Sequence, residues 1–268
     1  MNLQYHSVRV AVLGLVLSGL VICSLQGVLL AETTYFPYFA TGGGWQAVLL
    51  VVNDSNEDQT VRVLIGGAAG FETLDGLALD VEEGEAKFQI ALESETIQRF
   101  VIGSSSTQLQ TGFIVLESSD PITAALFFDA RVDGKVRESV GIMPKRDLGN
   151  RWLVPIETGS ERDTAVAILP EALSIEPSML SDPNSYLPAT IKLTLFNAEG
   201  VKVGSKNLEL SQIYSRFITE IFELPARFLG YLEIEGVSQF STPMVTALFF
   251  EWRGGGWELT AIPSLPAR

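Results

Sequence analysis

Short apolar runs separated by polar turns dominate the chain after residue 31. Residues 47–52 are a continuous apolar run that ends in the polar cluster 53–58, and residues 60–65 alternate apolar and polar side chains. Residues 190–196 alternate in the same way. Short β-branched runs between turn residues predict strands, so we expect residues 47–52 and 60–65 to pair as a hairpin.

One eight-residue stretch occurs twice. Residues 121–128 read P-I-T-A-A-L-F-F, and residues 243–250 read P-M-V-T-A-L-F-F, with five identical positions. Other landmarks recur at a similar spacing: Pro37 and Pro155 are 118 residues apart, against 122 for Pro121 and Pro243. A period of this length indicates two copies of one domain rather than the short units of a solenoid.

The spacing of the strand signals predicts an all-β fold. Strands at about ten-residue spacing with turns between them are typical of an antiparallel β-sandwich, and no amphipathic helix longer than two turns follows residue 31. We therefore expect two tandem immunoglobulin-like β-sandwich domains, residues 32–146 and 151–268, that touch each other. The second carries a proline-rich loop insertion, residues 171–189, that the first lacks.

An apolar segment precedes the first predicted domain. Arg9 is the sole charged residue before Glu32, and residues 10–25 are almost entirely apolar. This pattern predicts that residues 1–31 are an export signal, either cleaved or retained as a membrane anchor. A lipidated Cys23 is a third alternative, although Ile22 stands where lipoprotein signals carry a small residue. We expect an extracytoplasmic protein, secreted or periplasmic, that meets a membrane through this segment alone.

Charge and composition reduce the number of function classes that the sequence allows. The chain has 32 acidic and 18 basic residues and no basic stripe, so we do not expect a nucleic-acid partner. His6 and Cys23, the sole histidine and cysteine, both lie in the predicted leader. The rest of the chain therefore has no Ser-His-Asp or Cys-His nucleophile, no His or Cys zinc site and no internal disulfide. We expect no cofactor and no enzymatic activity, with a hydrolase built from carboxylates alone as the least favoured alternative.

An acid and an arginine follow each copy of the repeated stretch. Asp129 and Arg131 follow the first copy, and Glu251 and Arg253 follow the second. Residues i and i+2 of a strand share a face, so each pair can form a surface ion pair. A binding groove between the two domains is the alternative use of these charges.

The tryptophans supply the other binding candidates. Core or inter-domain packing is the usual role of such residues, but an aromatic ring exposed on a sheet can also stack on a sugar ring. Trp45, Trp252 and Trp257, together with the acid and arginine pairs, form the predicted binding surface. The partner expected there is an envelope or extracellular protein, or a glycan bound by the exposed tryptophans.

The polar cluster 53–58 could surround a calcium ion. The EF-hand pattern is not met, because Gln59 and Ile65 stand where a glycine and a bidentate glutamate are needed. A solvated hairpin turn is the favoured interpretation.

The opening F-P-Y-F-A-T-G-G-G-W at residues 36–45 and the stretch T-G-F-I-V-L-E-S-S-D-P-I at residues 111–122 resemble a β-sandwich module that recurs, often in tandem, in exported bacterial proteins. The resemblance implies a fold and an exported setting, without an activity. We expect an exported structural or adhesive binding protein of the bacterial cell envelope. Its working surfaces are predicted at residues 42–45, at residues 171–189 and at the seam between the domains.

Overall fold

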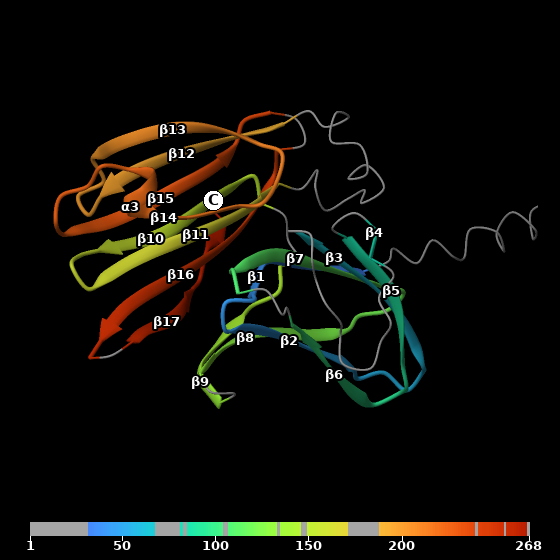
Figure 1. Cartoon of the computed structure of the whole chain (residues 1–268). Coiled ribbons are helices and arrows are strands. Elements are labelled where there is room, and N and C mark those ends of the chain that lie inside the picture. Colours follow the sequence, from blue (N-terminus) through green and yellow to red (C-terminus); the bar gives the residue numbers. More distant parts are fainter. Residues whose placement is uncertain are drawn as a thin grey trace, which may run out of the picture.

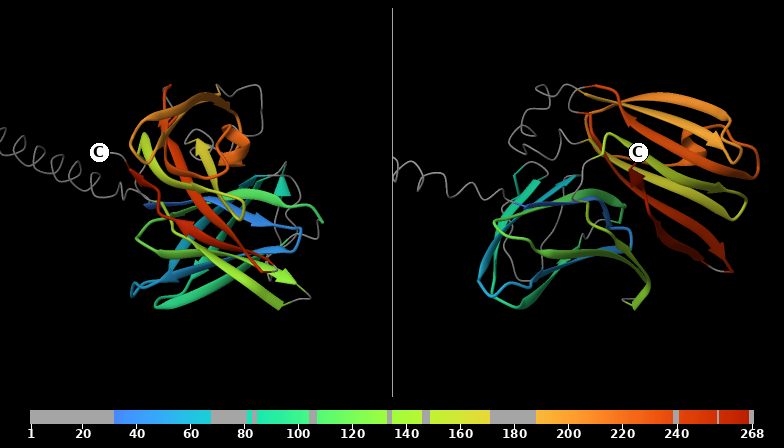
Figure 2. Two further views of the ribbon diagram at one scale, coloured as in Figure 1. Left: turned by 90° about the vertical axis from the view of Figure 1, so that its left-hand side faces the viewer. Right: turned by 180° about the vertical axis from the view of Figure 1, so that it is seen from behind.

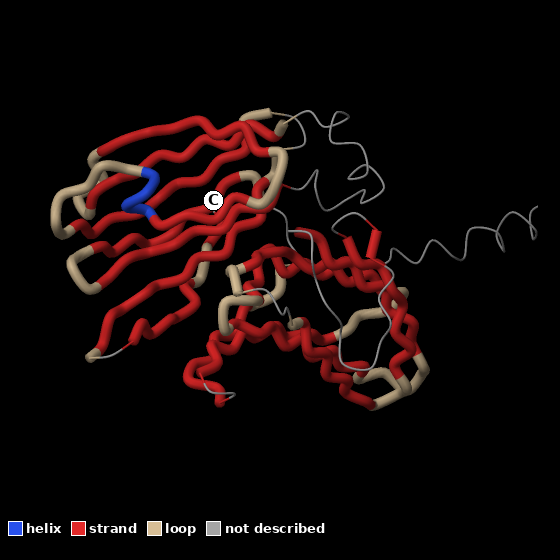
Figure 3. The backbone as a smooth tube through the Cα atoms, in the orientation of Figure 1, coloured by secondary structure: helices blue, strands red, loops and turns tan. Residues whose placement is uncertain are grey.

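The computed structural model describes residues 32–67, 81–82, 85–103, 107–132, 135–145, 149–170, 188–238, 241–254 and 256–266. The predicted leader and most of the predicted insertion at residues 171–189 lie outside these ranges. Strands dominate the described residues, and the one described helix is α3 (Ile218–Ile221) (Figure 3). Across the same ranges, no helix has the length and apolar character that a membrane span requires.

The strands are short and follow one another closely along the chain. In chain order they are β1 (Glu32–Thr41), β2 (Trp45–Asn53), β3 (Gln59–Gly67), β4 (Val81–Glu82), β5 (Glu85–Leu92), β6 (Thr96–Ile102), β7 (Gln110–Ser118), β8 (Thr123–Val132), β9 (Lys135–Ile142), β10 (Arg151–Thr158), β11 (Arg162–Pro170), β12 (Ala189–Asn197), β13 (Lys202–Leu210), β14 (Tyr214–Phe217), β15 (Phe228–Gly236), β16 (Pro243–Arg253), β17 (Gly256–Ile262) and β18 (Leu265–Pro266).

These strands form four antiparallel sheets. Sheet A has the order β1-β7-β3-β5-β4, and sheet B has the order β6-β2-β8-β9. Sheet C has the order β13-β12-β15-β10-β18, and sheet D has the order β14-β11-β16-β17. Sheets A and B come from the first half of the chain, and sheets C and D come from the second half (Figures 1 and 2).

The all-β prediction is confirmed, but the prediction of two tandem immunoglobulin-like β-sandwich domains is wrong. The strands are arranged as four small sheets, in the manner of the four blades of a β-propeller. The physical reason lies in sheet D, which buries both faces. Val245 and Ala247 of β16 belong to the core shared with sheet C, whereas Leu248 belongs to the core of sheets A and B. Sheet D therefore contributes side chains to the cores on both of its sides.

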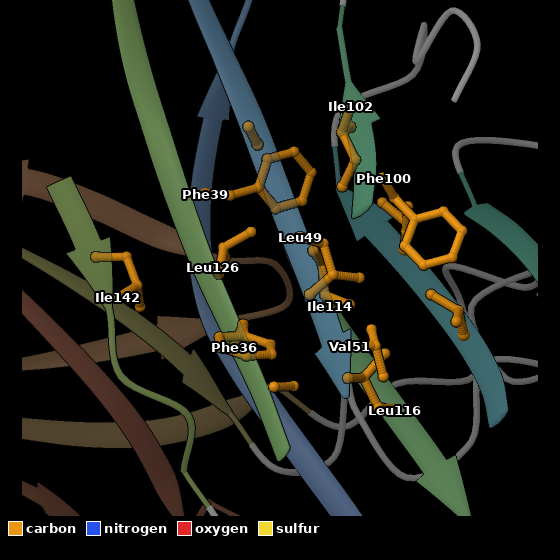
Figure 4. Close-up of a cluster of buried hydrophobic side chains, with 14 of the residues drawn as sticks. Phe36, Phe39, Leu49, Val51, Phe100, Ile102, Ile114, Leu116, Leu126 and Ile142 are labelled. Atoms are coloured by element: carbon orange, nitrogen blue, oxygen red, sulfur yellow. The ribbon is translucent and has the colours of Figure 1, made fainter. Parts of the chain in front are cut away.

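The core of the first half lies between sheets A and B. Phe36 and Ile114 from sheet A meet Leu49 and Leu126 from sheet B, and all four side chains are fully buried (Figure 4). Burying a side chain of this size stabilises the fold by about 1.5–3 kcal/mol. The alternating apolar positions of each strand point into this core, as their period of two requires.

A further apolar cluster joins sheets A and D. Tyr35 and Phe113 of sheet A pack with Leu169 and Met244 of sheet D. The two halves are thus in contact, as expected, and the contact is apolar.

The predicted hairpin between residues 47–52 and 60–65 is wrong, although both strands exist. β2 pairs with β6 and β8 in sheet B, while β3 pairs with β5 and β7 in sheet A, so residues 53–59 cross from one sheet to the other. Asn53 fixes this crossing, because its buried side-chain amide donates to the backbone oxygens of Glu57 (2.8 Å) and Glu93 (3.1 Å). These hydrogen bonds satisfy the buried amide, so the side chain of Asn53 has a structural role.

Candidate functional site

Two exposed tryptophans face each other across the β16–β17 hairpin, which projects at the lower left of Figure 1. Trp252 and Trp257 are paired directly in the ladder and are 41% and 47% exposed. Their rings meet edge to face, with centroids 5.5 Å apart and planes at 70°. The antiparallel pairing of the two strands places both rings on one face of sheet D.

The pair continues into a row of four aromatic rings. Phe250, two residues before Trp252 and therefore on the same face, lies 6.5 Å from Trp257, and Phe217 of β14 lies 4.9 Å from Phe250. Strand β11 lies between β14 and β16, and its Ala165, which has a small side chain, is the register partner of Phe217. We call Phe217, Phe250, Trp257 and Trp252 the aromatic row.

The aromatic row begins in the interface between the halves and ends in solvent. Leu248, on the same face of β16, is buried in the core of sheets A and B, and Phe250 is half-buried against that core. Trp252 is two residues further along and is exposed. The interior end of the row is therefore anchored by packing, while its two indoles are available to a ligand.

Carboxylates border the Phe217 end of the row. Asp163 is the register partner of Phe250; its Oδ2 accepts the Thr219 hydroxyl, and its Oδ1 accepts the Thr164 amide at 2.8 Å. Burial raises the pKa of Asp163, and the nearby charge of Glu220 raises it further, whereas these hydrogen bonds lower it. Glu220 itself accepts the Phe217 amide at 2.9 Å.

Another carboxylate lies beside β17. Glu138 of β9 accepts a hydrogen bond from the backbone N–H of Leu259, two residues from Trp257. Burial raises the pKa of Glu138, the bond from Leu259 lowers it, and the charge of Glu258 raises it. This contact also ties sheet B to the outer strand of sheet D.

The predicted ion pair after the second repeat is present, but it lies on the opposite face of sheet D from the aromatic row. Arg253 Nη2 is 2.6 Å from Glu251 Oε2. Arg162 joins the group, 2.8 Å from Glu251 Oε1 and 2.6 Å from Glu157 Oε1. The arginines are exposed, so solvent screening keeps the contribution of each pair to stability small.

The residues after the first repeat are arranged differently. Asp129 is buried, whereas Arg131 is exposed. Glu251 is only half-buried and forms an ion pair with Arg253. The two acid and arginine pairs therefore do not form equivalent surfaces.

Trp45 lies apart from the other two candidate tryptophans. Its half-buried ring packs edge to face on Phe128, with centroids 5.5 Å apart, at the border of the first-half core. The preceding glycine loop is held tightly, because Gly42 and Trp45 exchange two backbone hydrogen bonds and Arg131 donates to the Gly44 oxygen at 2.7 Å. The predicted working surface at residues 42–45 is thus a fixed corner turn.

The seam holds polar residues that sequence reasoning did not single out. Lys145 Nζ donates to Ser264 Oγ at 2.9 Å and lies 4.9 Å from the centroid of the buried Trp152 ring. Burial lowers the pKa of Lys145. Tyr38 of β1 is hydrogen-bonded to Ser215 of β14, and burial raises the pKa of Tyr38. These contacts join the halves across the seam.

Members of the site that the sequence did not reveal include Phe217, Phe250 and Asp163. Asp163 carried a weak signal, since it is the polar exception on a strand face that continues with Ala165 and Ala167. Across the described ranges, no group of three or more His, Cys, Asp or Glu residues could hold a metal ion. Comparisons of the chain with protein-family models, with curated proteins and with solved structures find no match.

Proposed function

We propose that this chain is an exported, non-catalytic binding protein of the bacterial cell envelope, with a structural or adhesive role, and that the aromatic row is its binding surface. The observation that carries the proposal is the exposed pair Trp252 and Trp257. Tryptophan is enriched where proteins bind partners, because burying one indole against a ligand removes a large apolar area from water.

The setting of the proposal comes from the sequence. The apolar residues 10–25 after Arg9 support export, and the acidic balance of the chain argues against a nucleic-acid partner. Catalysis by carboxylates is not favoured at the row, since both oxygens of Asp163 already accept hydrogen bonds from Thr164 and Thr219. A carbohydrate-binding module is the second candidate, and the same pair of exposed indoles favours it.

Binding to isolated cell envelopes tests the proposal. Mature protein is cosedimented with envelope fractions of the bacterium that produces it, and Trp252→Ala/Trp257→Ala is compared with the parent. We expect the double variant to bind at least tenfold more weakly. Both side chains are exposed, so the variant should keep the circular dichroism spectrum and melting temperature of the parent.

Leu229→Ala is the matched control. Leu229 of β15 is 63% exposed and belongs to sheet C, away from the row, so its removal should leave binding unchanged. Full envelope binding by the double tryptophan variant would overturn the assignment of this surface. Intact mass and cell fractionation of the native protein test export: a cytoplasmic protein that retains residues 1–31 would contradict that part.

A further inference from the structure

We propose that the aromatic row binds a single polysaccharide chain of uncharged sugar rings, and that the carboxylates bordering it exclude anionic polymers. The inference rests on the proposed function and names the ligand of the same surface. It depends on three observations: the exposure of the indoles, the angles between the rings, and the charge around them.

Exposed indoles suit sugar rings because both surfaces are flat and amphipathic. The C–H face of a sugar covers the aromatic face, while the sugar hydroxyls and the indole N–H remain in contact with water. Trp252 and Trp257 each retain over two fifths of their surface for such contact. The centroids of these two exposed rings are 5.5 Å apart, so one ligand can contact both indoles.

The angles between the rings select an isolated chain over a flat surface. Adjacent rings of the row are inclined by 68°, 75° and 70°. A crystalline polysaccharide presents a plane, and rings at such angles cannot all lie flat against one plane. A separate, soluble chain can turn its successive sugar rings to follow them.

The charge around the row selects against acids. Asp163, the register partner of Phe250, and Glu220 lie near Phe217, and Glu138 contacts β17 at Leu259, in a chain with a formal net charge of −14. A uronate or phosphate polymer would bring like charges beside these carboxylates, which weakens binding and slows encounter. Hydroxyl groups can instead donate to carboxylate oxygens.

Fluorescence titration of the mature protein with defined glycans tests the inference. The soluble neutral probes are cellohexaose and N-acetylated chitohexaose, the anionic probe is polygalacturonate, and the flat probe is microcrystalline cellulose. We expect a saturable change in tryptophan emission with at least one neutral hexaose, and at least tenfold weaker binding or none with the anionic and flat probes. Isothermal titration should show at least tenfold weaker binding by Trp252→Ala/Trp257→Ala and unchanged binding by Leu229→Ala.

Absence of binding to both neutral hexaoses, or equally tight binding of polygalacturonate, would overturn the inference. Envelope treatment separates it from the broader proposal. Digestion of the envelope with a glycosidase that hydrolyses the polymer of the bound hexaose should abolish envelope binding, whereas protease digestion of the envelope should not. The reverse pattern would overturn the glycan assignment and leave a protein partner for the same surface. Undiminished binding of untreated envelopes by the double variant would overturn both.

Discussion

The two copies of the repeated stretch lie in β8 and β16, and they bury opposite faces. Leu126 and Phe128 of the first copy point into the core between sheets A and B. In the second copy, Ala247 points into the core with sheet C, while Leu248 and Phe250 point toward the first half of the chain. Identical residues of the two copies therefore pack in different interfaces.

A difference of one residue in register causes the reversal. We call the turn between β1 and β2 the first corner and the turn between β10 and β11 the second corner. Trp45 follows the first corner and pairs with Ala130, and Arg162 follows the second corner and pairs with Glu251. Leu126 lies four residues before Ala130, and Ala247 lies four residues before Glu251. Ala247 therefore takes the strand position of Leu126, although the repeated stretch aligns Leu126 with Leu248. A slip of one residue in a strand turns every side chain to the other face.

The corners themselves also differ. Trp45 closes the first corner by packing on Phe128, whereas Arg162 closes the second through ion pairs with Glu157 and Glu251. The first half thus relies on buried aromatic area at a position where the second relies on exposed charge. This contrast can be tested by paired substitutions.

The largest difference should come from the two phenylalanines of the repeat. Phe128 is almost fully buried, so Phe128→Ala should lower the free energy of unfolding by about 3–5 kcal/mol. Phe250 is half-buried at the edge of the interface, so Phe250→Ala should cost about 1–2 kcal/mol. Urea denaturation measures both, and equal losses would contradict the assignment of opposite faces.

The corner residues should give the next largest difference. Trp45→Ala should cost about 2–3 kcal/mol, because it removes a half-buried aromatic packed on the core. Arg162→Ala should cost much less than Trp45→Ala, since its ion pairs are solvent-exposed. Salt separates the mechanisms: raising ionic strength should reduce the effect of Arg162→Ala and leave that of Trp45→Ala unchanged.

The smallest difference should come from the corner glycines. Gly44 has φ +91°, and an added Cβ would lie 3.2 Å from the Arg131 oxygen, so Gly44→Ala should cost about 1–2 kcal/mol. Gly159 lacks a positive φ, and an added Cβ would meet nothing within 4 Å. Gly159→Ala should therefore change stability by about 0.5 kcal/mol or less. A melting temperature lowered equally by both would argue against a strained first corner.

The strand content of the chain could be predicted because it depends on local patterns. The apolar run at residues 47–52 and the alternation at residues 190–196 lie in β2 and β12. The ion pair between Glu251 and Arg253 followed from the same period of two. Each of these features requires knowledge of one strand alone.

Features that depend on two strands could not be predicted. The pairing of β2 with β6 and β8, rather than with β3, depends on contacts distant in sequence. The predicted arrangement of the sheets was wrong for the same reason. In the sequence, the apolar residues on the outer face of sheet D cannot be distinguished from those of any other buried strand. Phe217 of β14 and Asp163 of β11 belong to the candidate site because β11 pairs with both β14 and β16. These pairings join residues that are distant in the sequence.

The double burial of sheet D also governs how the molecule comes apart. Ala167 and Leu248 complete the hydrophobic core of the first half, so detaching sheet D would open that core to water. We therefore expect neither half to keep a stable native state of its own, so that loss of one should bring loss of the other. Unfolding should follow one all-or-none transition, with the slowest-exchanging amide hydrogens of β2 and β11 sharing a single opening free energy.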